Sequence, residues 1–328
     1  MSNTSTTTST GSETLTIQRM AGRIGAEVDG VDLATPLDPQ VVTQVRTALL
    51  RHRVLFFRGQ RLTHEQHIAV GERFGALTTR ARPQDGTDLD EYPQILTIST
   101  QADLRVFGRD AEAHYRTRWA TPWSGWHCDV SHSVTPPAAS ILRAETVPPY
   151  GGDTHWTNLV AAYDGLSDPL RTFVDRLHTE HTFFAGYRMD SGDPFDRQLI
   201  DTVSANPMAA IHPLVRVHPE TQERVLFVSP SRISRIVELA PAESRALLAL
   251  LCAHITRPEY TTRWQWSAGD VAFWDNRATA HIAATDVPTG MERTLYRVTL
   301  AGDRPVGPDG SVSRLVSGRP PQAMTVPA

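Results

Sequence analysis

A histidine and an aspartate two residues apart form the clearest candidate metal-binding pair in this sequence. They are His127 and Asp129, within Trp126-His127-Cys128-Asp129. In an extended segment, residues two apart point to the same face, so the imidazole and the carboxylate would lie side by side. His281 is the best placed third ligand, because it follows residues 269–276, which indicate a turn and a strand running into a loop. Two histidines and one carboxylate with the other coordination positions open suit ferrous iron and oxygen chemistry.

Arg297 is a candidate for binding a carboxylate. It lies in residues 293–299, where alternation predicts a strand with 293, 295, 297 and 299 on one face. A planar guanidinium can bind a carboxylate through two parallel hydrogen bonds.

Five segments together resemble the taurine dioxygenase (TauD/TfdA) family of Fe(II)- and 2-oxoglutarate-dependent oxygenases. The order and spacing of these segments are more specific than any one of them, and they span roughly residues 16–304. They are residues 54–58, 126–129, 151–154, 274–277 and 293–297.

The resemblance implies a ligand set for the metal and for the cosubstrate. His127, Asp129 and His281 would hold Fe(II), and 2-oxoglutarate would chelate this iron. Its far carboxylate would reach Arg297 and the hydroxyl of Thr154. A buried carboxylate is tolerable only when it is paired and hydrogen-bonded, which an arginine and a hydroxyl provide. No catalytic residue beyond the metal ligands is expected.

The same resemblance implies O2-dependent oxidation of an unactivated C–H bond, with release of succinate and CO2. Hydroxylation is the family's usual outcome, while desaturation and isonitrile formation in secondary metabolism remain open. Halogenation is disfavoured, because related halogenases replace the carboxylate with a small residue and this chain keeps Asp129.

Departures from taurine dioxygenase at residues 79–83 and at Trp123 argue against taurine as the substrate. Arginines at several expected pocket positions favour a small anionic metabolite instead, such as a carboxylate, sulfonate or sulfate ester. Its apolar part would lie near Trp123 and Tyr187. Each arginine could equally be an ordinary solvated side chain. The candidates are Arg80, Arg188, Arg232 and Arg293.

Two other classes of protein stay open. A zinc-dependent hydrolase could use the same three ligands, but Arg297 would then have no role. A non-catalytic metal-binding relative would be expected to have lost a ligand, and none is lost here.

The amino-acid composition of the chain bears on its partners and its location. The net charge of −4 over 328 residues gives no basic surface for nucleic acid. The two cysteines offer no disulfide framework and fit a reducing compartment. No apolar run is long enough to span a membrane, and the Ser/Thr-rich start lacks the regions of a signal peptide, so a cytoplasmic protein is expected. The resemblance implies a homo-oligomer, either a dimer or a tetramer.

The predicted fold is mixed α/β but mainly β, with a double-stranded β-helix (a jelly roll, cupin-like) as the core and helices outside. Residues 1–15 are expected to be disordered, 16–305 to form a single catalytic jelly-roll domain, and 306–328 a loose C-terminal tail.

Local patterns predict some of the elements. Helices are expected from Asp38, from Thr63 to Gly75 and over residues 241–255, and strands over 54–57 and 94–98. The rest of 78–123 is weakly patterned, which suits a lid or substrate loop, or else a surface loop without substrate contact.

Overall fold

The fold was analysed in a computed structural model, which describes residues 15–79, 91–283, 285–288 and 290–320. The predicted disordered segment 1–15 therefore lies almost wholly outside the described residues. The same is true of Arg80, one of the arginines predicted to bind substrate.

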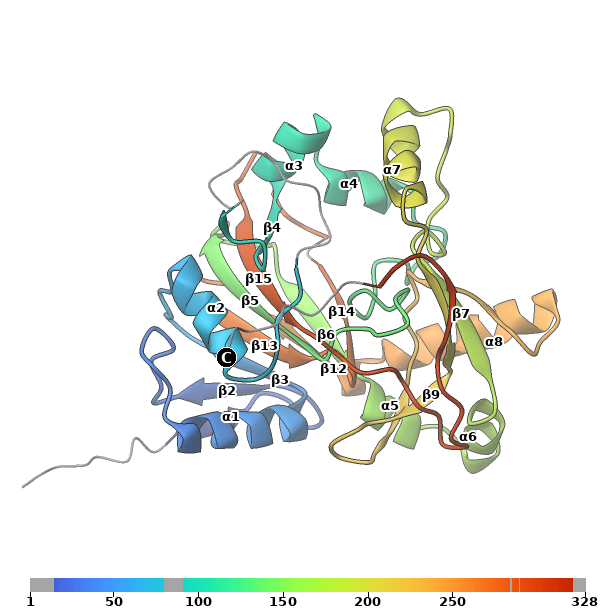
Figure 1. The fold of residues 1–328 in the computed structure, drawn as a ribbon, viewed down its shortest axis with the longest axis horizontal. Coiled ribbons are helices and arrows are strands. Elements are labelled where there is room, and N and C mark those ends of the chain that lie inside the picture. The colour runs from blue at the N-terminus through green and yellow to red at the C-terminus, as the bar shows by residue number, and fades with distance from the viewer. Residues whose placement is uncertain (1–14, 80–90, 284, 289, 321–328) are drawn as a thin grey trace, which may run out of the picture.

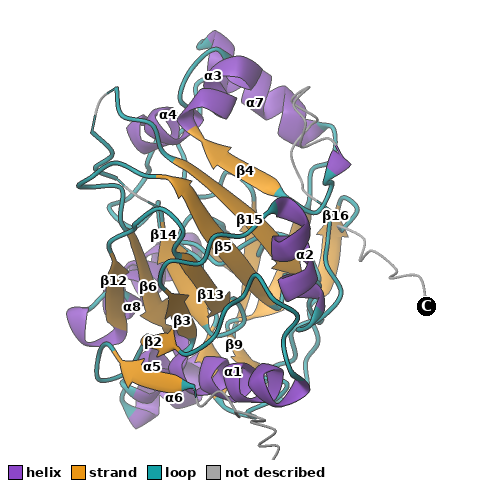
Figure 2. Cartoon of the chain, turned by 90° about the vertical axis from the view of Figure 1, so that its left-hand side faces the viewer, coloured by secondary structure: helices purple, strands orange, loops and turns teal. Residues whose placement is uncertain are grey.

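A seven-stranded sheet forms the main layer (Figures 1 and 2). All its neighbouring strands pair antiparallel except β2 and β3, which are parallel. The central strands are rich in β-branched and aromatic residues, and β3 and β13 are buried throughout. In sheet order the strands are β1 (Thr16–Arg19), β2 (Ala26–Asp29), β3 (Val54–Phe57), β13 (Val271–Asp275), β5 (Ala139–Thr146), β15 (Thr294–Leu300) and β4 (Leu96–Ser99).

Three smaller antiparallel sheets complete the β structure. The first has the order β12 (Thr261–Trp264), β6 (Thr154–Asn158), β14 (Thr279–Ile282). The second has the order β11 (Ile233–Ile236), β7 (His178–Thr182), β8 (Ala209–Pro213), β16 (Arg314–Ser317), and the third pairs β9 (Val215–Val217) with β10 (Arg224–Leu226).

An aromatic cluster joins the main sheet to the three-stranded sheet. Trp274 of β13 packs against Trp156 of β6, with 5.8 Å between the ring centroids. Phe56 of β3 stacks on Trp264 of β12, with 4.2 Å between the ring centroids. All four side chains are almost completely buried. The three-stranded sheet, which carries His281, is thus fixed by close packing to the main sheet, which carries Arg297.

Helices cover the sheets on the outside. Asp38 caps α1 through its side chain, and Thr63 with Gln66 forms a capping box for α2, as the sequence indicates. Figure 1 shows α3, α4 and α7 together at one end of the molecule. The helices are α1 (Pro39–His52), α2 (His64–Glu72), α3 (Thr100–Phe107), α4 (Ala111–Thr117), α5 (Leu159–Asp164), α6 (Asp168–Val174), α7 (Pro194–Ser204) and α8 (Pro241–Ile255), with the 3-10 turn η2 (Pro258–Tyr260).

The segment 78–123 is more regular than predicted, because α3 and α4 both lie in it. Both helices are short, and their start is set by single side chains: Ser99 caps α3 and Asp110 caps α4. Eight or fewer residues give too few turns for a periodic pattern to stand out.

One other feature differs from expectation. The described part of the predicted loose tail contains β16, which pairs with β8, so backbone hydrogen bonds hold it. A strand at the edge of a sheet needs little hydrophobic pattern of its own, and the Pro- and Gly-rich composition hid it.

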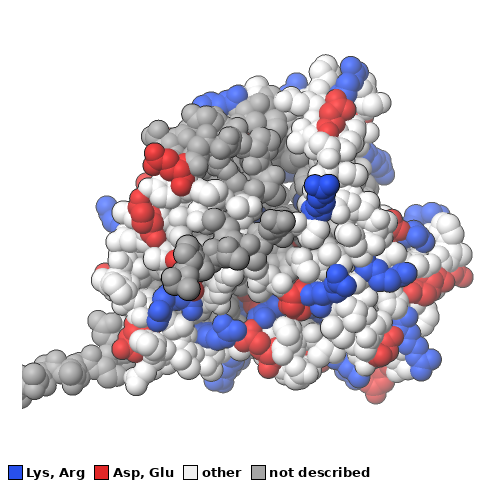
Figure 3. Space-filling model, in the orientation of Figure 1, with Lys and Arg blue, Asp and Glu red and all other residues white. Residues whose placement is uncertain are grey.

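No helix among the described residues is long and apolar enough to span a membrane. On the face shown in Figure 3, basic and acidic side chains are interspersed over the described surface.

Candidate metal centre

A short backbone ladder brings His127 and His281 together. The amide nitrogen of each lies 2.8 Å from the carbonyl oxygen of the other. His281 belongs to β14, where it is paired with Trp156 of β6. The two imidazole rings lie 4.3 Å apart between centroids. Residues 154 positions apart in sequence therefore present their rings to the same space.

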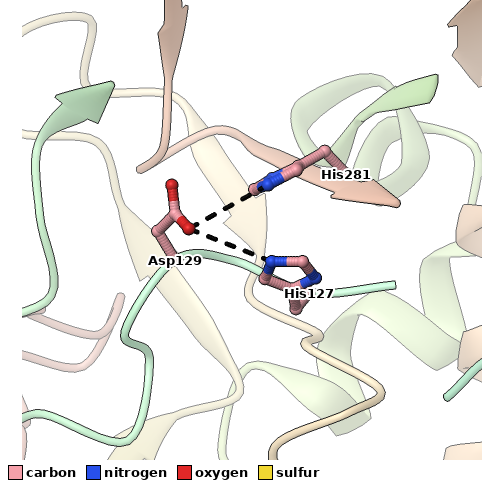
Figure 4. A group of neighbouring side chains, drawn as sticks. All are labelled: His127, Asp129 and His281. Carbon is pink, nitrogen blue, oxygen red and sulfur yellow. Dashed lines mark ion pairs between the residues drawn. The ribbon is translucent and has the colours of Figure 1, made fainter. Parts of the chain in front are cut away.

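Asp129 completes the group from a turn rather than from the predicted strand. Only His127 of the motif makes a β-bridge, and the chain turns directly after Asp129, where Val130 has a φ of 46°. Oδ1 of Asp129 lies 3.9 Å from Nε2 of His127 and 4.0 Å from Nε2 of His281 (Figure 4). One ligand atom from each residue falls within 4.8 Å of the other two. This spacing leaves room for one metal ion between them.

Asn276 and Ser140 fix the aspartate. The Asn276 side chain accepts a hydrogen bond from the Asp129 amide at 2.7 Å and donates to the Asp129 carbonyl at 3.2 Å and to the Pro137 carbonyl at 3.0 Å. Ser140 of β5 donates to Oδ2 of Asp129 at 2.8 Å. Oδ1 is consequently the oxygen that faces the imidazoles. Neither positioning residue was predicted from the sequence, although Asn276 lies in one of the segments that carry the family resemblance.

The protonation states suit metal binding. Burial lowers the pKa of His127 to about 4 and that of His281 to about 3, so both rings are neutral near pH 7. Burial acts to raise the pKa of Asp129, but Arg297 and the two imidazoles outweigh it and hold this pKa well below its usual range. Two neutral imidazoles and one carboxylate are the protonation states required of metal ligands.

The Nδ1 atoms of His127 and His281 have different surroundings. Nδ1 of His127 lies 3.0 Å from the carbonyl oxygen of Gly125, which favours the proton on Nδ1 and leaves the Nε2 lone pair for a metal. Nδ1 of His281 is buried without a hydrogen-bond partner among the described residues. Packing against Trp274, at 5.0 Å between centroids, orients this second ring.

The structure separates the two arginines of the 293–297 segment. Arg297 of β15 donates to Oδ1 of Asp129 at 2.5 Å. Arg293, predicted to bind substrate, is buried and donates to the Gly152 carbonyl at 3.0 Å and to Oγ1 of Thr154 at 3.4 Å. Trp266 also donates to this hydroxyl, at 3.0 Å. Thr154 therefore contacts Arg293, whereas Arg297 contacts Asp129. The binding of the far carboxylate of 2-oxoglutarate by Arg297 and Thr154 stays a prediction.

The remaining candidates for substrate binding fall in different places. Trp123 packs against the hydrophobic core around α5 and α8, and the half-buried Tyr187 contacts the ring of Tyr115 at 5.2 Å between centroids. Arg188 donates to the Ala120 carbonyl at 3.3 Å. Arg232 lies close enough to His127 for its charge to act on that ring.

A second group with possible metal ligands is built differently. His114, Asp193 and Asp196 meet between α4 and α7, but Arg118 forms ion pairs with Asp196 at 2.7 Å and with Asp193 at 3.2 Å. Asp193 also caps α7. These carboxylates already have cationic and backbone partners, so the cluster fixes α4 to α7.

The three side chains fit a non-haem iron, because two imidazole nitrogens and one carboxylate oxygen that converge are the donor set of such sites.

The chain is similar to known dioxygenases over most of its length. The family model described as "Taurine catabolism dioxygenase TauD, TfdA family" matches residues 16–299. An alpha-ketoglutarate-dependent sulfate ester dioxygenase of Pseudomonas putida is 37% identical over 96% of this chain and 98% of its own, and an alkylsulfatase of Acinetobacter baylyi is 33% identical over 90% and 88%.

A solved structure supports the same assignment. A taurine dioxygenase from Burkholderia xenovorans is 48% identical, covers 93% of this chain and 96% of its own, and superimposes with a TM-score of 0.79. The mixed α/β architecture with several antiparallel sheets agrees with it. The chain therefore belongs to the TauD/TfdA family and is an alpha-ketoglutarate-dependent dioxygenase.

Proposed function

We propose that His127, Asp129 and His281 bind Fe(II) and that the enzyme oxidises an unactivated C–H bond of a small anionic substrate, most simply by hydroxylation. The observation that carries this proposal is the convergence of two neutral imidazoles and one ionised carboxylate within 4.8 Å. Iron and 2-oxoglutarate, when bound, supply the activation of O2, with succinate and CO2 as the products of the cosubstrate.

We assign the far carboxylate of 2-oxoglutarate to Arg293 and Thr154, in place of the predicted pair Arg297 and Thr154. Arg293 is buried, and its guanidinium and the Thr154 hydroxyl already lie within hydrogen-bond distance of each other. A buried cation next to a hydroxyl is suited to a carboxylate. Arg297, beside the ligand oxygen of Asp129, would instead contact negative charge close to the metal.

The protein's own contribution is to position groups and exclude water. Asn276 and Ser140 orient Asp129, and the Trp156–Trp274 packing shields His281 from solvent. Fixed, desolvated ligands leave the open coordination positions to the cosubstrate and oxygen. The arrangement of the main sheet and the three-stranded sheet on either side of these residues supports the predicted double-stranded β-helix core.

A sulfate ester or a sulfonate is the substrate class we favour. The relatives above act, by their names, on sulfate esters and taurine. Arg232 and Arg297 give this chain positive charge near the metal ligands, in keeping with an anionic substrate. Desaturation and isonitrile formation remain less supported outcomes of the same chemistry. The cytoplasmic location and the role in secondary metabolism stay predictions from the sequence.

One experiment tests the reaction class. Fe(II) and 2-oxoglutarate are added to the protein without oxygen, and the visible spectrum is recorded. Oxygen is then admitted with alkyl sulfates or alkylsulfonates, and succinate is quantified. We expect a weak charge-transfer band and substrate-dependent succinate in the wild type, and neither in Asp129→Ala. A colourless wild-type protein that cleaves a substrate without oxygen would point to a zinc-type hydrolase and contradict the proposal.

A further inference from the structure

The segment that precedes β11 lies against the metal motif. The amide of Ser231 donates to the carbonyl of Trp126, the residue before His127, at 3.0 Å. The next residue, Arg232, accepts a hydrogen bond from the Thr182 amide through its carbonyl, at 2.7 Å. The backbone of residues 231 and 232 is thereby fixed beside the first iron ligand.

Among the residues that the structure describes, the Arg232 side chain has no anionic partner. Its guanidinium lies over the ring of Phe183, 4.2 Å from the centroid, and donates to the Phe183 carbonyl. Its Nε is buried without a hydrogen-bond partner, and Arg232 has no ion pair with any carboxylate in the described parts of the chain. Arg297 differs in this respect, because it pairs with Asp129.

Two more unpartnered polar atoms occur in the same neighbourhood. Nδ1 of His132 and Oγ of Ser231 are buried and make no hydrogen bond within the described structure. The His132 ring meets the Phe183 ring edge-on, with 5.3 Å between the centroids. Arg232 lies over the same Phe183 ring. Buried polar groups are nearly always hydrogen-bonded, so a cluster of unpartnered ones is consistent with a site for a ligand or water.

We propose that Arg232, supported by the ring of Phe183, binds the anionic group of the substrate beside His127 and so sets the preference for sulfated or sulfonated molecules. This rests on the proposed function, because it needs the substrate to lie next to the iron. The sulfate and sulfonate groups each offer three oxygens to the guanidinium and to the free polar atoms of Ser231 and His132. Phe183 holds the guanidinium plane, so little side-chain entropy is lost on binding.

Binding measured without turnover tests this role. The full chain is loaded anaerobically with Fe(II) and 2-oxoglutarate, and the charge-transfer band is recorded first. Hexyl sulfate, hexane-1-sulfonate and uncharged 1-hexanol are then titrated by calorimetry. The variants are Arg232→Gln, Arg232→Lys and Arg235→Gln. Arg235 is a matched control, since it is three residues away, more than half exposed and paired with Glu180 at the surface.

Arg232→Gln is expected to weaken the binding of hexyl sulfate or hexane-1-sulfonate at least tenfold, equivalent to about 1.4 kcal/mol. Arg232→Lys should recover part of this loss, and Arg235→Gln should bind both anions as the wild type does. Affinity for 1-hexanol should be the same in all proteins.

Equal affinity for the anions in Arg232→Gln and wild type would overturn the proposal, as would a wild type that binds neither anion. These results differ from failure of the proposed function, which would show as absence of the charge-transfer band before any anion is added.

Discussion

The side chain of Asn276 makes three hydrogen bonds, two of them to the backbone of Asp129, the proposed iron ligand, so Asn276→Ala should weaken both the fold and the proposed metal site. The bonds join it to the amide and carbonyl of Asp129 and to the carbonyl of Pro137, and Asn276 is buried. At a net value of about 1 kcal/mol per hydrogen bond, we expect the free energy of unfolding to fall by about 3 kcal/mol. Loss of a group that orients a metal ligand should weaken Fe(II) binding by about 10- to 100-fold.

Asn158→Ala is the control for that prediction. Asn158 is buried and also makes three side-chain hydrogen bonds, to the Arg23 carbonyl and from the amides of Val160 and Ala161. It should lose a similar free energy of unfolding, measured by urea denaturation, but keep its Fe(II) affinity, measured by anaerobic titration. If Asn276→Ala bound Fe(II) as tightly as Asn158→Ala does, the idea that Asn276 positions Asp129 for the metal would be refuted.

Two further predictions concern the cosubstrate and acid stability. Arg293→Met should raise the KM for 2-oxoglutarate by about 10- to 150-fold, because a charge-assisted pair is worth about 1.5–3 kcal/mol. A larger increase of this KM in Arg297→Met than in Arg293→Met would favour Arg297 as the partner of the far carboxylate, as the sequence predicts. Stability should fall as the pH is lowered from about 6.5 to about 3. Burial lowers the pKa of His67 to about 3, so the unfolded chain binds a proton in this window and the folded chain does not. This one histidine contributes up to about 1.4 kcal/mol per pH unit, and His67→Gln should flatten the measured dependence.

The sequence predicted the convergence of His127, Asp129 and His281 better than the groups around them. His127 and Asp129 lie two residues apart, and His281 follows a recognisable strand, so motif and spacing were enough to group these candidate ligands. Which arginine would meet Thr154 was not readable, because Arg293 and Arg297 were expected on the same strand face. The three-dimensional path of the chain between β6 and β15 decides that contact.

Elements with a strong local signal were also predictable. The capping box at Thr63 and the 15-residue apolar pattern of α8 mark their helices directly. The short helices α3 and α4 and the edge strand β16 carry little pattern of their own, since their stability comes from capping and from partners distant in sequence. Asn276 likewise has no local sequence pattern that indicates its role, because this role depends on the turn at Asp129, which is distant in sequence.

The most direct test of the account is to locate the iron. Crystals grown without oxygen in Fe(II) and 2-oxoglutarate would be measured by anomalous diffraction at the iron absorption edge. The account predicts one strong peak at bonding distance from Nε2 of His127, Nε2 of His281 and Oδ1 of Asp129. A peak at His114, Asp193 and Asp196 instead, or none between the two imidazoles, would contradict it.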